Sequence, residues 1–317
     1  AAARASAGQL GAAAQEEGGS AAEGGAADDA DAGAALLRLA EGRVRRSIQS
    51  FPPRELTSVV LAYALAQQGS QDLFAVLQKA CTERCREFPV EQAASLLWSF
   101  ATVRLGPSFF REVQFDVLEG LNQFAPPAVC DVLWSYCVVR LRDPQLFRAL
   151  LSVLVPSRVA GDPRCALLCP ALLDVRASLP DLDPEGLERY EGYARREFRR
   201  TQLAAAPPRA ALRSIASALA SLGWQAEELA DLDGYVLDVV ARRPGQEDEL
   251  QPPVAVLYHS PGGTLHLQTG EPLGPAIMRQ RHLRQRGYRC VNLSGRAWEQ
   301  MSAEEQAAHL RGKLQAP

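Results

Sequence analysis

The pattern of this chain is set by one stretch, FPVEQAASLLWSFATVRLG at residues 88–106. Related stretches begin at Phe51 and Phe124, so that three units follow one another at intervals of 37 and 36 residues. Each opening phenylalanine is followed within three residues by proline, and apolar or small residues then recur at fixed offsets without gaps. In unit order, the recurring residues are Leu61, Trp98 and Trp134; Tyr63, Phe100 and Tyr136; Ala64, Ala101 and Cys137; and Leu73, Phe110 and Leu146. Self-similarity at a fixed period of this length is typical of a structural repeat.

Each unit has the pattern of two helices. Proline near the start suits a first helical turn, and Leu56, Val60 and Tyr63 lie on one stripe of an amphipathic helix. A helix breaker then precedes a second apolar segment; the breakers are Gly69, Gly106-Pro107 and Asp143-Pro144. Two helices per period predict an α-solenoid. We expect units near 51–87, 88–123 and 124–158 within a helical region over 35–200. Residues 36–48 have the pattern of an earlier unit's last helix, and residues 166–173 and 184–199 have that of a degenerate, capping continuation.

The two ends of the chain have other patterns. Residues 1–34 carry six acidic residues and one arginine among alanine and glycine, which predicts a disordered, low-complexity acidic tail. We expect a linker at 201–210 and then a small α/β domain over 211–317, with its core at 254–312. Its expected strands lie at 235–240, 254–258 and 288–293, and its expected helices at 211–222, 275–286 and 302–314.

Composition excludes several classes of protein. The chain has 317 residues, of which 47% are hydrophobic, and a net charge of −3. These values exclude wholesale disorder, and no apolar run approaches the ~18 residues of a membrane-spanning helix. Four histidines, and seven cysteines without closely spaced pairs, argue against a metal site or a disulfide scaffold. We therefore expect no metal, no cofactor and no membrane partner, and we expect reduced thiols.

The C-terminal part of the chain resembles a known module. The segments that carry the resemblance are VAVLYHSPGG at 254–263, Thr269-Gly270, RQRHLRQRGY at 279–288 and Trp298-Glu299. In order and spacing they are similar to the RAP domain, in which a strand, a Thr-Gly loop, a basic helix and a tryptophan precede a closing helix. The upstream segments LLWSFA at 96–101 and VLWSYC at 132–137 resemble octotricopeptide repeats, or the related helical repeats of FAST-kinase-like proteins. Proteins with such repeats commonly end in a RAP domain.

The resemblance implies an organellar RNA-binding protein that acts in RNA processing, mRNA stability or translation. Its implied partners are mRNA or rRNA and the proteins of ribonucleoprotein particles. The implied location is the mitochondrial matrix or, alternatively, the chloroplast stroma. A structural subunit of an organellar ribosome or another large ribonucleoprotein is the main alternative, and the near-neutral charge and short repeat array favour it. A metal-dependent endonuclease is a second, disfavoured alternative.

The nuclease alternative arises because RAP domains resemble the PD-(D/E)XK nuclease superfamily. Such an enzyme needs clustered carboxylates to hold a divalent cation, and a lysine. Asp238 matches the first carboxylate, but Leu257 stands where the second acid is expected, and His259 follows without a lysine. We therefore expect a degenerate nuclease-like fold at Asp238, Leu257 and His259, and we expect no catalytic residue and no enzymatic activity.

The expected RNA contacts are arginines. Six of them lie close together with no acid between residues 276 and 296; they are Arg279, Arg281, Arg284, Arg286, Arg289 and Arg296. A helix with Ile277 and Leu283 facing inward would direct most of these cations outward, as phosphate binding requires. The alternative is an ordinary solvated helix face, because 32 of the 34 basic residues are arginine throughout the chain. We expect Trp298 and the repeated aromatic residues to pack in the core.

Overall fold

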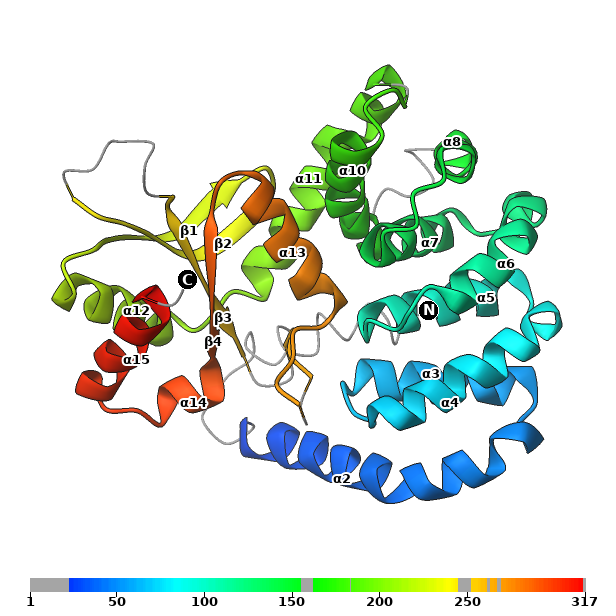
Figure 1. The fold of residues 1–317 in the computed structure, drawn as a ribbon, viewed down its shortest axis with the longest axis horizontal. Helices are drawn as coiled ribbons and strands as arrows, with labels where there is room; N and C mark the ends of the chain where they lie inside the picture. The colour runs from blue at the N-terminus through cyan, green and yellow to red at the C-terminus, as the bar shows by residue number, and fades with distance from the viewer. Residues whose placement is uncertain are drawn as a thin grey trace.

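The computed structural model describes residues 23–154, 162–182, 184–244, 252–260, 263–266 and 269–315. A helical N-terminal region lies beside a C-terminal region in which helices surround a small mixed sheet (Figure 1). The sequence predicts a disordered tail over residues 1–34. Residues 1–22 of this tail lie outside the described residues. A helix begins at Glu23, so the prediction of disorder is wrong for the rest of the tail. Across the described ranges, no helix combines the length and apolar character needed to cross a membrane.

The N-terminal region consists of helix pairs, as the repeat predicts, and it has no strands within its described residues. The first helices of the pairs are α3 (Pro53–Leu65), α5 (Val90–Thr102), α7 (Pro126–Val139) and α10 (Leu168–Ser178). The second helices are α2 (Glu23–Ser47), α4 (Gln71–Glu83), α6 (Ser108–Glu119), α8 (Pro144–Val153) and α11 (Pro184–Ala204). The 3-10 turns are η2 (Ile48–Ser50), η3 (Cys85–Glu87), η4 (Leu121–Gln123) and η5 (Pro163–Leu167). First helices contact first helices from α3 to α10, and second helices contact second helices from α2 to α8.

A hydrogen bond that recurs at one offset ties the pairs together. The Tyr63 hydroxyl donates to the carbonyl oxygen of Leu37 at 2.7 Å, and the Tyr136 hydroxyl donates to that of Phe110 at 2.8 Å. In both cases the acceptor lies 26 residues earlier. Helix α2 therefore occupies the place of a second helix in an earlier unit. The middle unit has Phe100 at this position, where no hydroxyl is present.

The C-terminal region contains a four-stranded sheet with the order β1-β2-β3-β4. The strands are β1 (Gln225–Leu232), β2 (Tyr235–Arg242), β3 (Val254–His259) and β4 (Arg289–Ser294). Neighbouring strands are antiparallel except β3 and β4, which are parallel and are connected through α13 (Gly274–Gln285). The other helices here are α12 (Arg209–Ser221), α14 (Gly295–Glu299) and α15 (Ala303–Gln315).

Strand β1 was missing from the sequence prediction. Its first four residues are exposed, so that they show no alternation of apolar and polar residues. The signal that could have revealed it is the pair Asp233-Gly234, which forms the two-residue turn between β1 and β2. Both residues have positive φ, 52° and 91°, as a type I′ hairpin turn requires, and Asp-Gly is a preferred sequence for that turn.

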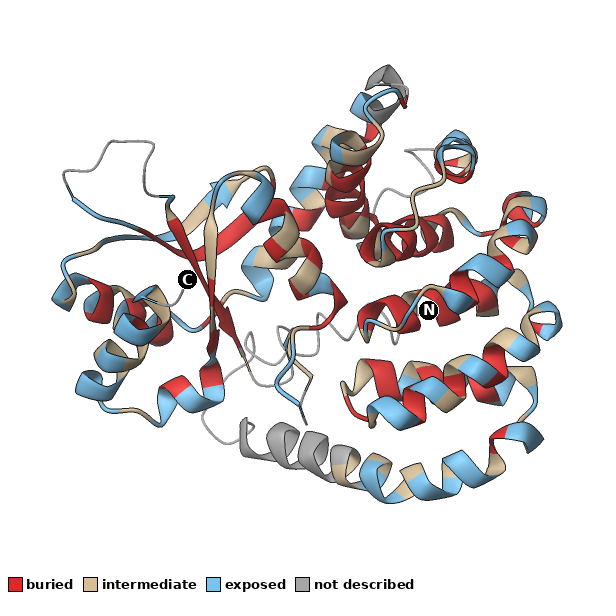
Figure 2. Cartoon of the chain, viewed as in Figure 1, coloured by how far each residue is buried: buried red, intermediate tan, exposed pale blue. Residues whose placement is uncertain are grey.

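The sheet is buried on both sides. Tyr235, Leu237 and Leu257 belong to a hydrophobic cluster that continues into the helical region. On the other side, Val239 and Val256 pack in a second cluster with residues of α12, α14 and α15. Figure 2 shows that α7 and β3 are buried over nearly their whole length. The sequence suggested a separate α/β domain, but its sheet completes the core of the helical region.

The linker predicted at residues 201–210 accordingly joins two helices. Helix α11 continues to Ala204, and α12 begins at Arg209. Both helices pack against the sheet, α11 on β2 and α12 on β1 and β2. The break in the sequence pattern therefore marks a change of secondary structure within a continuously packed molecule.

The recurring tyrosine bond leads to a stability prediction. We expect Tyr136→Phe and Tyr63→Phe each to lower the free energy of unfolding by about 1 kcal/mol, because each removes one hydrogen bond within a helix stack. We expect Phe100→Tyr to fold with a stability within about 1 kcal/mol of the wild type, because the carbonyl 26 residues earlier, that of Phe74, occupies the equivalent place. Urea unfolding measures all three. A Phe100→Tyr protein destabilised by more than about 3 kcal/mol would show that the units do not stack equivalently.

Candidate functional site

Helix α13, which carries the predicted arginine patch, lies against the C-terminal ends of two first helices. At its start, a Cβ atom on Gly274 would lie 2.2 Å from the carbonyl oxygen of Ala101 in α5, so only glycine fits this contact. One end of a helix carries partial positive charge and the other partial negative charge. The N-terminus of α13, with its partial positive charge, therefore meets the C-terminus of α5, with its partial negative charge.

Further along α13, Arg281 caps the next helix. Its Nη2 donates to the carbonyl oxygen of Cys137 at 2.9 Å, and its Nη1 to that of Val138 at 3.5 Å, both in the last turn of α7. The Cys137 carbonyl oxygen also accepts the backbone N–H of Arg140 at 3.3 Å, and a cation is favourable at this end of a helix. Arg281 thus fixes α13 to the helical region.

A buried carboxylate completes the junction. Asp174 of α10 is only 1% exposed, and its oxygens lie 2.8 Å from Arg281 and 3.2 Å from Arg142. The ring of His282 lies 3.5 Å from the same carboxylate and, through Nδ1, 2.9 Å from the hydroxyl of Tyr235 in β2. One acid on α10 therefore holds side chains from the α7–α8 connection and α13, and His282 in turn contacts Tyr235 of β2.

The protonation states at this junction follow from burial and charge. Burial opposes ionisation of Asp174, but the contact with His282 and the charges of Arg281 and Arg142 outweigh it and hold the Asp174 pKa below its ordinary value. Burial also disfavours the charged form of His282 and lowers its pKa, which the contact with Asp174 only partly offsets. At neutral pH, the junction thus contains a charged Asp174 and a neutral His282.

A second ionic chain joins the β1–β2 turn to the helical region. Asp233 lies 2.7 Å from Arg286 of α13 and 3.7 Å from Arg195 of α11. Glu191 lies 3.2 Å from Arg195 and 2.9 Å from Arg176. These side chains alternate in charge from one region to the other.

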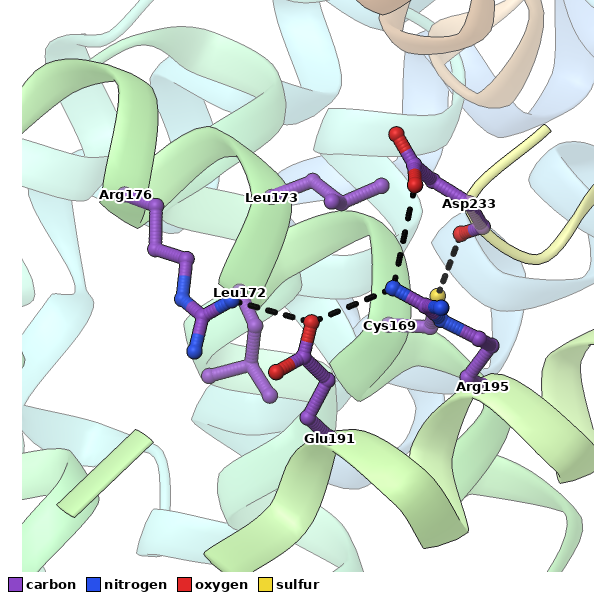
Figure 3. A pocket seen from close by; sticks show the side chains of 7 residues that line it. All are labelled: Cys169, Leu172, Leu173, Arg176, Glu191, Arg195 and Asp233. Atoms are coloured by element: carbon purple, nitrogen blue, oxygen red, sulfur yellow. Dashed lines mark hydrogen bonds and ion pairs between the residues drawn. The ribbon is translucent and has the colours of Figure 1, made fainter. Parts of the chain in front are cut away.

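Four residues of this ionic chain, Arg176, Glu191, Arg195 and Asp233, line a small pocket between α10, α11 and the β1–β2 turn (Figure 3). The charged groups in it point toward one another. At its base, Cys169 donates to the carbonyl oxygen of Asp233 at 3.6 Å, and burial raises the pKa of its thiol to about 12. The pocket is therefore lined by paired charges and a protonated thiol, and these groups serve to stabilise the fold.

The structure places the six predicted arginines differently from the sequence expectation. Four of them contact other elements of the fold, and a fifth, Arg284, donates to Gln280 Oε1 within α13 at 3.4 Å. Arg281 and Arg286 hold Asp174 and Asp233, as described above. Arg279 donates to the carbonyl oxygen of Val236 at 2.7 Å and lies 3.3 Å from Asp238, and Arg289 donates to the carbonyl oxygens of Lys313 and Leu314 at 2.8 and 2.7 Å. Arg284 and Arg296 are exposed.

The expectation of an outward-facing basic helix is therefore wrong for most of α13. Ile277, predicted to face inward, is half-buried, whereas Met278 and Leu283 are buried. The opposing acids come from α10, the β1–β2 turn and β2. No sequence spacing within the helix could reveal them.

The positions that resemble a nuclease site are also engaged. The Asp238 carboxylate accepts a hydrogen bond from the backbone N–H of Tyr258 at 2.9 Å and pairs with Arg279. Leu257 is fully buried in the core shared with the helices. Within the part of the chain that the structure describes, no three His, Cys, Asp or Glu residues gather as a metal site would require.

His259, the third of these positions, belongs to a buried polar network. Its Nδ1 lies 2.6 Å from Thr264 Oγ1, and its Nε2 lies 2.9 Å from Asn292 Oδ1. Burial lowers the pKa of His259, although the hydrogen bond with Asn292 opposes this. Gln280 of α13 donates to the same Asn292 oxygen at 3.0 Å. The network joins the ends of β3 and β4 to α13.

Comparison with known protein families agrees with the resemblance in the sequence. Residues 264–313, which include α13, β4, α14 and most of α15, match the RAP domain. We call this part of the chain the RAP domain because of that similarity. Its tryptophan, Trp298, is 2% exposed and donates to Ser214 Oγ at 2.8 Å, so it packs in the core. A comparison with curated proteins finds no match.

The RAP domain junction leads to a stability prediction for two arginines on one helix. We expect Arg281→Ala to lower the free energy of unfolding by about 3–5 kcal/mol, because it leaves the buried Asp174 without its closest cation. Arg284→Ala, on an exposed position of the same helix, should change stability by less than about 0.5 kcal/mol. Chemical denaturation compares the two. Equal stability of the two variants would show that α13 does not depend on Asp174.

A pH dependence follows from the lowered pKa of His282. The unfolded chain takes up a proton at His282 near its ordinary pKa of about 6.5, and the folded protein does so only at lower pH. Stability present above pH ~6.5 is therefore lost as the pH falls toward the folded pKa, by at most about 1.4 kcal/mol per pH unit from this group. We expect His282→Gln to flatten the fall in melting temperature between pH 7 and 5 more than His309→Gln on α15 does. An equal effect of the two substitutions would contradict the assignment.

Proposed function

We propose that this protein binds RNA in an organelle and acts in RNA processing, mRNA stability or translation. The observation that carries the proposal is the match of residues 264–313 to the RAP domain, which is generally an RNA-binding domain. The resemblance of the upstream segments to octotricopeptide or FAST-kinase-like repeats supports the organellar setting. On that basis we place the protein in the mitochondrial matrix, with the chloroplast stroma as the alternative.

We propose that the helix pairs form a short α-solenoid. Stacking of like helices on like helices, and the tyrosine bond at one offset, support this. In this arrangement the RAP domain closes one side of the array, because α13 lies against the ends of α5 and α7 and packs on α10. The array and the RAP domain would then act on RNA as one unit.

We further propose that the sheet has a degenerate nuclease-like fold that serves binding rather than catalysis. Its first candidate carboxylate, Asp238, is already held by Arg279 and by a backbone N–H group. Its second candidate position is the buried Leu257, which cannot ligate a cation. Such a site lacks the clustered carboxylates with which metal-dependent nucleases hold their ions.

A structural subunit of an organellar ribosome or another ribonucleoprotein is the second candidate function. The use of Arg279, Arg281, Arg286 and Arg289 in internal contacts favours it, since these cations are then less available for RNA. The net charge of −3 points the same way. In this role the protein would contact both rRNA and neighbouring proteins.

Single-stranded RNA binding at several salt concentrations tests the main proposal. The exposed Arg284 and Arg296 are the predicted contacts that remain available. Each phosphate contact contributes about −0.7 to the slope of log affinity against log salt, so Arg284→Ala/Arg296→Ala should flatten that slope by about 1.4. Arg111→Ala/Arg148→Ala, which removes two exposed cations from α6 and α8, serves as the charge-matched control.

The same experiment separates the candidate functions. Equal slopes for the two double variants would remove Arg284 and Arg296 from the interface. Absence of binding by the wild-type protein at low salt would contradict a free RNA-binding factor and favour the ribonucleoprotein subunit. Cleavage of the RNA in the presence of magnesium that is lost in Asp238→Ala would contradict a purely binding role.

A further inference from the structure

Three first helices of the repeat end in the same unusual way. The first or second residue after each helix has a left-handed backbone, with φ of 53° at Gln67, 63° at Arg104 and 62° at Arg140. The next backbone N–H group bonds back to a carbonyl five residues earlier, over 3.1 Å after α3, 2.9 Å after α5 and 3.2 Å after α7. This is the Schellman motif, whose left-handed position is usually occupied by glycine.

Two other helices of the chain end in the Schellman motif with glycine at the left-handed position. Helices α12 and α13 end with the same pair of bonds, and their left-handed residues are Gly223 and Gly287, with φ of 78° and 80°. A residue with a Cβ atom is less stable in this conformation. The three repeat helices thus place long side chains where glycine would be more stable, and these side chains therefore need another explanation.

Two of the three side chains form hydrogen bonds to another part of the chain. Gln67 Nε2 donates to the carbonyl oxygen of Gly263, and Arg104 Nη1 donates to that of Pro272 at 3.1 Å. Both acceptors belong to the segment between β3 and α13. The first two members of the row therefore hold the RAP domain against the helix ends.

The third member, Arg140, has the same backbone but a different environment. It is exposed, and within the described ranges its side chain makes no hydrogen bond or ion pair. The acid nearest to it in sequence, Asp143, is engaged at the start of α8, where it accepts a hydrogen bond from the N–H of Gln145 at 2.8 Å. Beneath Arg140, the last carbonyl groups of α7 are already covered by Arg281. As far as the described residues show, its guanidinium is thus available to an acceptor from outside the chain.

We propose that Arg140, at the start of the α7–α8 connection, binds the phosphate backbone of an RNA strand that passes over this side of the helical array. The proposal rests on the RNA-binding function proposed above and adds a site on the helical array. An exposed guanidinium offers several donors in a planar fork that matches phosphate oxygens. Bare helix ends would repel an anion, but here Arg281 and the start of α13 offset their negative charge.

The left-handed backbone allows a test in which stability and binding change in opposite directions. Arg140→Gly removes the strain of a Cβ atom in the left-handed backbone conformation, and it also removes the cation. We expect it to raise the melting temperature by about 2 °C, to weaken single-stranded RNA binding about fivefold at low salt, and to flatten the salt slope by about 0.7. Differential scanning fluorimetry and filter binding with one unstructured RNA measure these effects. Arg140→Lys, which keeps the charge, should retain the wild-type slope.

Two matched controls separate the effects. Gln67→Gly makes the same change of residue at the equivalent left-handed position without a change of charge, and it should leave the RNA affinity unchanged. Arg148→Ala removes one exposed cation from α8 without affecting a left-handed residue, and it should weaken binding less than twofold. The proposed site is supported only if the loss of affinity is specific to Arg140→Gly.

Other results would overturn the proposal. A lower melting temperature of Arg140→Gly would show that the side chain is structural, and a loss of affinity equal to that of Arg148→Ala would show that only net charge matters. Wild-type binding with an unchanged Arg140→Gly affinity would overturn this site alone and leave the proposed function intact. No binding by the wild type would overturn the proposed function and this site together.

Discussion

The carboxylate of Asp174 is the point at which the two regions of the protein meet. It lies on α10, it is almost completely buried, and its partners include Arg142 from the helical region and Arg281 from the RAP domain. A buried charge is tolerated only when it is paired. The position of α13 is thereby fixed, and with it the contact of the sheet with the helices. The shared core and the row of helix ends both depend on this placement.

This placement changes the role of the basic helix. In a sequence, six arginines without an intervening acid indicate an anion-binding surface. In the folded protein, Arg281 covers the end of α7, and Arg289 covers the end of α15. Arginine does this well because its planar group donates several hydrogen bonds at once. Arg284 and Arg296 of this set remain exposed, as does Arg140 on the helical array.

Local patterns in the sequence predicted the local structure well. The helix pairs followed from proline positions, breakers and apolar spacing, which act over a few residues. Strand β3 and helix α13 were predicted for the same reason, whereas the RAP domain was identified by its resemblance to a known module. Contacts between distant segments could not be predicted. Arg279 meets Asp238 41 residues away, and Arg286 meets Asp233 53 residues away, so the charge balance appears only in three dimensions. Strand β1 was missed because its exposed residues lack alternation.

The sheet that completes the helical core also has a consequence for biosynthesis. The ribosome releases the helix pairs first, and the contacts of Ala101 with Gly274 and of Cys137 with Arg281 form only when the last part of the chain has emerged. Contacts so far apart in sequence slow folding, and apolar surface that waits for a partner is prone to aggregation. The nascent protein therefore passes through a stage in which the flank of its helical array is unprotected, and a chaperone that shields apolar flanks would act at that stage.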